Sequence, residues 1–145
     1  VINKAFTKEE GSFVALNELK YSTGSRATGT TLYSFKIGGQ DIEPQFNVYS
    51  VEDKNMETYT YMLGNKEIYL SLYYGIPDQS DFDGSISVSV DGHEVLSNSA
   101  KYQLRKPDFF EFYFEQANEL KITIEGNEKL WDIGFREMKY FWIEC

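Results

Sequence analysis

Hydrophobic and polar residues alternate in short runs along most of the chain. The clearest run is SISVSV, in which Ile86, Val88 and Val90 alternate with serines. Because successive side chains of a β-strand point to opposite faces, this period of two predicts a half-buried strand. The pair Asp91-Gly92 follows and favours the positive φ angles of a two-residue hairpin turn. The next run, HEVLS, is therefore expected to return antiparallel.

Further strands are predicted wherever apolar residues recur at short intervals: SFVALNELK, LYSFKIGG, FNVYSVED, METYTYML, EIYLSLYYG, DFFEFYFE, ELKITIEG and KLWDIGFREMKYFWIEC. The first also fits a short helical turn, and the last fits one bent or two short strands. Gly38-Gly39 predicts a turn, and Gly64-Asn65 predicts a tight reversal between METYTYML and EIYLSLYYG. No long segment keeps a helical period, so an all-β, antiparallel β-sandwich of about eight to ten strands is expected.

Length and composition favour one domain over residues 1–145, with a core from about 12 to 143, because 145 residues with 41% hydrophobic content can bury one core. The formal net charge of −9 repels phosphate backbones and anionic membranes, so nucleic acid is excluded as an expected partner. No apolar run approaches the roughly 20 residues of a membrane span. The opening VINKAF lacks Met, so we expect a module of a longer or processed protein.

Catalytic signatures are weak in this sequence. His93 is the single histidine and is expected to be a solvated strand residue, and no G-x-S-x-G motif presents a nucleophilic serine. The single cysteine, Cys145, is the last residue, where a base is hard to hold beside a thiol. A carboxylate pair for glycoside hydrolysis is spatial, and nothing marks one pair among 23 acidic residues. We therefore predict no catalytic residue.

Three aspartates precede the serine run: Asp78, Asp81 and Asp83. They do not form a helix-loop-helix calcium loop, because Gln79 stands at the first ligand position and Val90 at the twelfth. Two interpretations remain. The aspartates could bind a structural calcium ion with backbone carbonyls, or they could be solvated turn residues that cap backbone N–H groups.

The order of segments resembles the NPCBM family of carbohydrate-binding modules, a branch of the galactose-binding-like jelly rolls. The matching pieces include FVALNELKYST, YTYMLGNKEIYLSLYYGIPDQSDFDGSISVSVDGHEVLSNS, FYFEQANELKITIEGN and WDIGFREMKYF. The resemblance implies a jelly-roll fold and a non-catalytic accessory module that binds carbohydrate outside the cell or at its surface. The segment before the last strand, GNEKLWDIGF, is shorter than in family members. Only Trp131 and Asp132 therefore stand at positions comparable to that segment of the family.

A sugar site needs a flat ring for the apolar face of the pyranose and carboxylates or amides for its hydroxyls. The candidate ligand-binding residues form three groups: Trp131 with Asp132, Tyr74 with Asp78 and Asp81, and Tyr33 with Arg26. Packing in the core is the alternative for each ring, and we expect Trp131→Ala to abolish binding with little loss of stability. Two other functions stay open: a protein-interaction or structural module of a surface or phage-like protein, and a glycoside hydrolase.

Overall fold

The computed structural model describes residues 4–16, 21–24, 32–50, 56–78, 84–99 and 106–144, with side chains for 10–16, 32–50, 56–78, 84–99 and 106–140. The strands of this part are β1 Lys4–Ala15, β2 Tyr21–Gly24, β3 Phe35–Ile37, β4 Gln40–Ile42, β5 Val48–Tyr49, β6 Met56–Gly75, β7 Gly84–Val90, β8 His93–Ser99, β9 Asp108–Gly126 and β10 Lys129–Glu144. All of their pairings are antiparallel.

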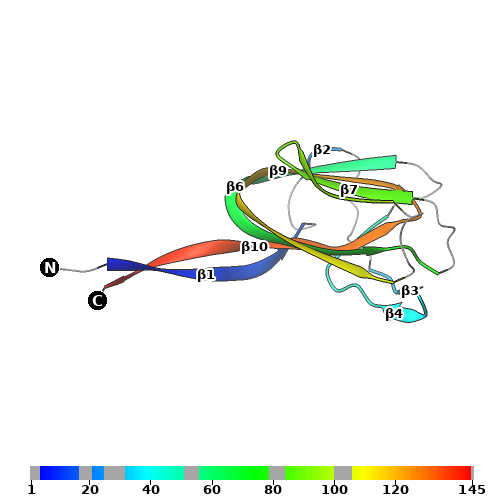
Figure 1. The fold of residues 1–145 in the computed structure, drawn as a ribbon, viewed down its shortest axis with the longest axis horizontal. Coiled ribbons are helices and arrows are strands. Elements are labelled where there is room, and N and C mark those ends of the chain that lie inside the picture. Colours follow the sequence, from blue (N-terminus) through cyan, green and yellow to red (C-terminus); the bar gives the residue numbers. More distant parts are fainter. Residues whose placement is uncertain are drawn as a thin grey trace.

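Two long strands, β6 and β9, bend together and run through both layers of a sandwich (Figure 1). The sheet order is β1-β10-β6-β9-β7-β8, with β2 added to β6 and β5 added to β10. We call the layer that holds β2, β7, β8 and the adjoining halves of β6 and β9 the β7 layer. The β10 layer holds β1, β5, β10 and the other halves. The predicted antiparallel β-sandwich is confirmed.

The bend in β6 lies at Gly64 and Asn65, whose φ angles are 83° and 57°. The predicted reversal at this pair is wrong, because β6 continues without a turn to Gly75. The register with β9 shifts between Met62 and Lys66 instead. A β-bulge accepts positive φ and bends a strand, so the dipeptide that suits a hairpin turn also suits a corner.

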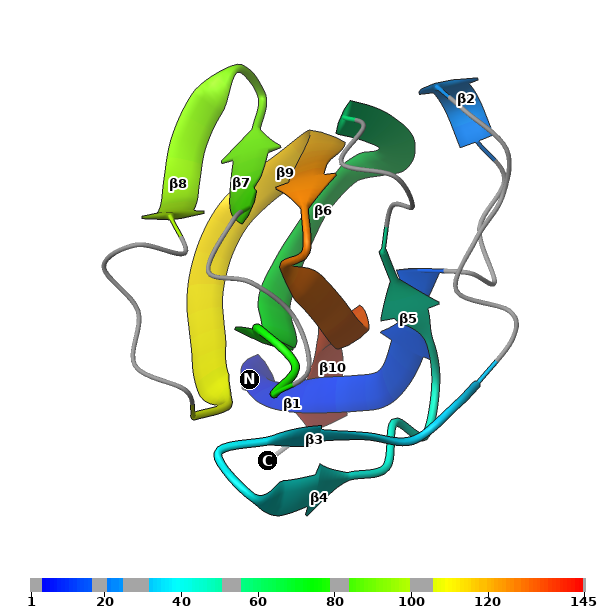
Figure 2. The same cartoon turned by 90° about the vertical axis from the view of Figure 1, so that its right-hand side faces the viewer.

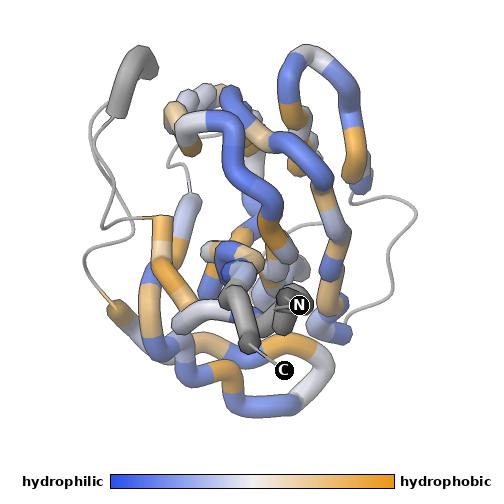
Figure 3. The backbone as a smooth tube through the Cα atoms, turned by 90° about the vertical axis from the view of Figure 1, so that its left-hand side faces the viewer, coloured by the Kyte–Doolittle hydropathy of each residue, from blue (hydrophilic) through white to orange (hydrophobic). Residues whose placement is uncertain are grey.

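The space between the layers is filled by alternating aliphatic residues. Ile86, Val88 and Val90 of β7 are buried, and β8 returns after a turn at Asp91 and Gly92, with φ angles of 51° and 82°. Both predictions for this hairpin are confirmed. Hydrophobic and hydrophilic positions alternate along the strands (Figure 3). The main core contains Leu16, Tyr49, Tyr59, Tyr61, Leu63, Ile68, Leu70, Leu72, Ile86, Val88, Val90, Ala117, Leu120, Ile122, Ile124, Leu130, Ile133 and Phe135.

A separate hairpin, β3–β4, lies against the outer side of the β10 layer (Figures 1 and 2). It turns at Gly38 and Gly39, as predicted, with φ angles of 59° and 79°. A second apolar cluster joins this hairpin to the layer and contains Ile37, Ile42, Val48 and Trp131. This small core holds the hairpin against the outer face of the layer.

Beyond the sandwich, β1 and β10 continue side by side as a two-stranded ribbon (Figure 1). The backbone pairs run from Lys4 opposite Glu144 to Glu10 opposite Met138. Within the described ranges, no helix has the length and apolar character needed to cross a membrane.

Candidate functional site

A groove of about 530 Å³ lies on the outer face of the β10 layer, beside the β3–β4 hairpin. Its lining comes from β1, β4, β6, β9, β10 and the segments next to β4 and β9. These residues are Phe13, Gln40, Asp41, Ile42, Glu43, Gln45, Phe46, Ser71, Tyr73, Pro107, Phe109, Glu111, Trp131, Asp132 and Arg136. Ligand pockets commonly measure about 300 to 1,000 Å³, so this groove is large enough for a small saccharide.

One wall of the groove is an aromatic row across three strands. Tyr73 of β6 pairs with Trp131 of the neighbouring strand β10 on one side and with Phe109 of β9 on the other. The Tyr73 ring lies 6.1 Å from Trp131 in a stacked arrangement and 4.9 Å from Phe109. Tyr73 is 40% exposed and Phe109 is 52% exposed, whereas Trp131 is 3% exposed. The surface available to a ligand therefore belongs mainly to Tyr73 and Phe109, because Trp131, at the end of the row, packs against Ile37, Ile42 and Val48.

Phe13 of β1 and Phe46, which precedes β5, form the facing wall. Their ring centroids lie 4.8 Å apart, and Phe46 is 46% exposed. The guanidinium of Arg136 lies 5.8 Å from the centroid of Phe13, within cation–π range. This wall therefore combines two apolar rings with one hydrogen-bond donor of positive charge.

Small residues lie between the two walls. Gly134 of β10 pairs with Ser71 of β6, and Ser71 pairs with Glu111 of β9. A Cβ atom at Gly134 would lie 2.4 Å from the Phe13 ring and 2.4 Å from the carbonyl oxygen of Val14. Glycine is therefore required for Phe13 to lie this close to the sheet.

Asp132 holds the segment that carries Phe46. Asp132 lies in a β-bulge of β10 and has a φ angle of 51°. Its Oδ1 accepts hydrogen bonds from the backbone N–H groups of Gln45, Phe46 and Asn47 at 2.9, 2.7 and 3.4 Å. The neighbouring Asn47 is buried and exchanges two side-chain hydrogen bonds with the backbone of Ile133, at 2.9 and 3.0 Å. The Asp132 carboxylate therefore orders one side of the groove by accepting hydrogen bonds from the backbone of residues 45–47.

Trp131 and Asp132, the pair suggested by the family resemblance, both line the groove. Their positions differ from the expectation of an exposed ring beside a free carboxylate. The indole is almost fully buried against Ile37, Ile42 and Val48, and the expectation that Trp131→Ala leaves stability unchanged is corrected accordingly. Their role in ligand binding stays a prediction.

Tyr74 lies on the opposite face of β6 from Tyr73 and packs against the main core. Burial raises the pKa of its hydroxyl, and the nearby carboxylates of Asp108 and Glu128 raise it further. Tyr74 is not among the groove residues. The structure therefore does not bring Tyr74 together with Trp131 and Asp132.

The remaining predicted residues lie elsewhere. Asp78 accepts the backbone N–H groups of Gly38 and Gly39 at 2.5 and 2.8 Å, so it caps the β3–β4 turn. The Tyr33 hydroxyl shares a hydrogen bond with Ser50 and accepts one from the Lys129 ammonium at 2.8 Å. Three candidates, Arg26, Asp81 and Asp83, fall outside the described residues.

The predicted calcium site at Asp78, Asp81 and Asp83 is not tested, because two of its three side chains fall outside the described ranges. Within those ranges, no three His, Cys, Asp or Glu side chains lie close enough together to hold a metal ion. Both Asp78 carboxylate oxygens already accept backbone N–H groups.

Sequence reasoning did not identify Tyr73, Phe109, Phe46, Glu111 or Arg136 as site residues. A signal was present in DFFEFYFE, where the face of Phe110, Phe112 and Phe114 drew attention. The other face of the same strand supplies Phe109 and Glu111 to the groove. Period-two alternation identifies both faces of a strand, but it does not reveal which face lies beside another element.

Glu128, next to the start of β10, is a buried carboxyl group away from the groove. It is 0% exposed, and neither of its oxygens has a hydrogen-bond partner among the described residues. Burial, and then the charge of Asp108, raises the pKa of Glu128 to about 8. The group is therefore protonated in the folded protein at neutral pH.

No protein-family profile matches the sequence, and a comparison with curated protein sequences finds no match. Solved structures do resemble the fold. The CBM51 module of Clostridium perfringens GH95, in complex with methyl-galactose, aligns with a TM-score of 0.61 at 13% identity over 86% of this chain and 99% of that one. The CBM51-2 and INT domains of C. perfringens ZmpB align with a TM-score of 0.65 at 13% identity.

The ZmpB alignment covers 88% of this chain and 32% of that structure, so this chain spans about a third of its length. A further structure, of the CBM51-2 domain in complex with GlcNAc together with the INT domains, has a TM-score of 0.62 at 13% identity. Carbohydrate-binding modules thus recur among the matching structures. The chain has the jelly-roll β-sandwich fold of the CBM51 carbohydrate-binding modules.

Proposed function

We propose that this protein is a non-catalytic carbohydrate-binding module that binds a glycan in the groove of the β10 layer. The observation that carries the proposal is the meeting of exposed Tyr73, Phe109 and Phe46 around one hollow that also contains carboxylates and an arginine. Aromatic rings match the apolar face of a pyranose, and the charged groups can hydrogen-bond its hydroxyls. The shared fold with CBM51 modules agrees with this chemistry.

Binding is expected to be weak. The groove is open to solvent along its aromatic walls, so water competes for every hydrogen bond that a sugar makes. One or two stacked rings and a few such bonds supply roughly 4 to 7 kcal/mol, which corresponds to a Kd between roughly 10 μM and 1 mM. Weakly binding modules gain useful affinity when several are linked. The proposal also places this protein outside the cell or at the cell surface, as an accessory module.

The test is a glycan array followed by isothermal titration calorimetry with the strongest ligand. Phe109→Ala should weaken binding at least ten-fold. The melting temperature should change little, because the Phe109 ring is half exposed and does not belong to the main hydrophobic core. Met56→Ala removes an exposed apolar side chain from the β7 layer and serves as the matched control. Equal affinities for Phe109→Ala and the wild type would contradict the proposed site.

Absence of binding to any glycan at millimolar concentration would refute the proposed function itself. A stoichiometric protein partner in a pull-down, together with indifference to sugars, would favour a protein-interaction module instead. Turnover of aryl glycosides that is lost on replacing Glu111 or Glu43 would make the protein a glycoside hydrolase. We expect neither outcome.

A further inference from the structure

The groove carries more negative than positive charge. Its lining includes the carboxylates of Asp41, Glu43, Glu111 and Asp132 against the single guanidinium of Arg136. Two of these acids are already engaged, because Asp41 lies 3.7 Å from the Lys36 ammonium and Asp132 accepts backbone N–H groups. The other two, Glu43 and Glu111, are therefore the acids whose carboxylates are left for a ligand.

Glu43 and Glu111 approach the groove from different elements. Glu43 follows β4 on the hairpin side, and Glu111 lies in β9 opposite Ser71. Neither carboxylate has an ion-pair or hydrogen-bond partner among the described residues. Their free acceptor atoms lie in the same hollow as the exposed faces of Tyr73 and Phe109.

Aromatic faces and free carboxylates together favour a cation. A ring attracts a positive charge held over its face, and a carboxylate forms a charge-assisted hydrogen bond with an ammonium group. A neutral sugar would use the rings but gain little from the negative field. An acidic sugar would be repelled by the same field, in a protein whose net charge is −9.

We propose that the preferred ligand of this groove is a glycan whose amino sugar carries a free, protonated amine, with Glu43 and Glu111 as the groups that select it. This inference rests on the proposed function, because it concerns the same groove. It adds a ligand class, the de-N-acetylated amino sugar, and predicts that blocking the amine by acetylation weakens binding.

The experiment compares the β-1,4-linked disaccharide of N-acetylglucosamine with its fully de-N-acetylated form by calorimetry at pH 6. At low salt the free amine form should bind about 3- to 10-fold more tightly. Two solvent-exposed ion pairs between ammonium groups and carboxylates change an affinity by about this much. At 300 mM NaCl this ratio should shrink, because salt screens exposed charges. At pH 9 the amines lose their charge and the ratio should approach one, with the acetylated form reporting any change in the protein itself.

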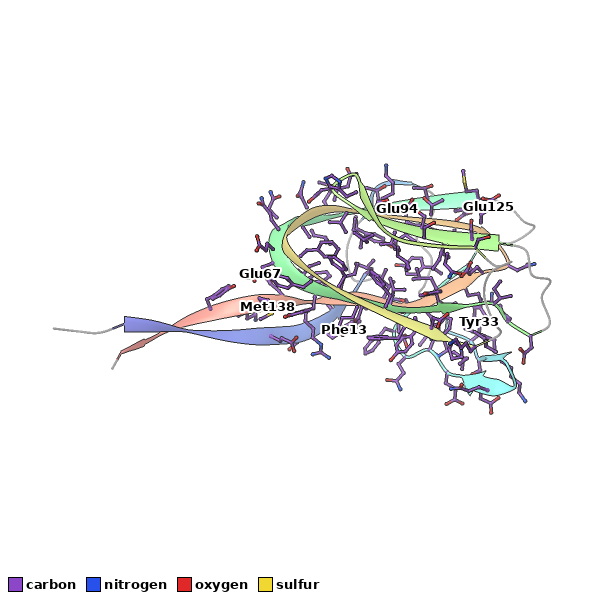
Figure 4. All side chains as sticks on the ribbon, viewed as in Figure 1. Phe13, Tyr33, Glu67, Glu94, Glu125 and Met138 are labelled. Carbon is purple, nitrogen blue, oxygen red and sulfur yellow. The ribbon has the colours of Figure 1, made fainter. Side chains whose placement is uncertain are left out.

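Three controls make the result specific to the groove. Glu111→Gln and Glu43→Gln should each reduce the preference about two-fold, whereas Glu94→Gln, which removes the same charge from the exposed side of the β7 layer, should leave it unchanged (Figure 4). Phe109→Ala should weaken both disaccharides. Spermidine, an amine without a sugar ring, should not displace either disaccharide at equal concentration.

The two proposals fail in different ways. If the acetylated disaccharide binds as tightly as the free amine form, and Phe109→Ala weakens both, the amine preference is overturned while the sugar-binding function stands. If Glu94→Gln reduces the preference as much as Glu111→Gln does, the selectivity comes from the overall charge and the assignment of Glu43 and Glu111 is wrong. If neither disaccharide nor any arrayed glycan binds, both proposals fall.

Discussion

Replacing Glu128 with Gln should change how stability depends on pH. The carboxyl group is fully buried without a hydrogen-bond partner among the described residues, and its pKa is raised from 4.5 to about 8. In the unfolded chain the group ionises near its ordinary pKa of 4.5, whereas in the folded protein it keeps its proton up to about pH 8. Raising the pH through this window therefore favours the unfolded state, which loses the proton first.

The size of the effect follows from the two pKa values. Each pKa unit corresponds to about 1.4 kcal/mol, so a difference from 4.5 to about 8 gives a maximum of about 5 kcal/mol. The stabilisation is complete below the unfolded pKa and is lost as the pH rises to the folded pKa. Between about pH 5 and about pH 8 the free energy of unfolding should fall by roughly 3 to 4 kcal/mol because of this one group.

The assay is urea unfolding of the wild type and Glu128→Gln at pH 5, 6, 7 and 8. Gln keeps the shape of the side chain and cannot ionise, so its own cost is a constant offset. The difference between the two proteins should change by nearly the full value of about 1.4 kcal/mol per pH unit in the middle of the window. Glu125→Gln, at an exposed position three residues earlier (Figure 4), controls for the removal of a general negative charge. A difference that is flat with pH would refute the reasoning and show that Glu128 is ionised in the folded protein.

Three other predictions concern the groove and the aspartates. Trp131→Ala should lower the free energy of unfolding by about 3 to 5 kcal/mol, measured by urea denaturation, because the indole is buried between the hairpin and the sheet; a loss below about 1 kcal/mol would contradict this packing. Asp132→Ala should lower it by about 1 to 3 kcal/mol and weaken glycan binding, since the Phe46 backbone N–H loses its acceptor; the matched Asp41→Ala should leave stability nearly unchanged. If Asp78, Asp81 and Asp83 bind calcium, chelation should lower the melting temperature and added calcium should restore it; identical melting curves would contradict the site.

Local periodicity was sufficient for several elements of this fold. The alternation around Val88 and around Ile122 defined their strands and buried faces, and Asp91-Gly92 defined the hairpin between β7 and β8. Each of these features depends on neighbouring residues alone. The corner at Gly64-Asn65 was misread for the same reason, because its positive φ angles suit a reversal and a bulge equally, and the choice depends on β9 lying alongside.

The sequence by itself determined that the chain is all-β and that its sheets share an apolar interior. Only the tertiary structure decided that Tyr73, Phe109, Phe46, Glu111 and Arg136 meet in one groove, since they come from strands and segments that are distant in the chain. It also decided that Trp131 is buried against the β3–β4 hairpin beside Tyr73 and that the Asp132 carboxylate holds a backbone segment. The physical reason is that strand register and hairpin docking, both long-range, determine which of a strand's two faces stays exposed to a ligand.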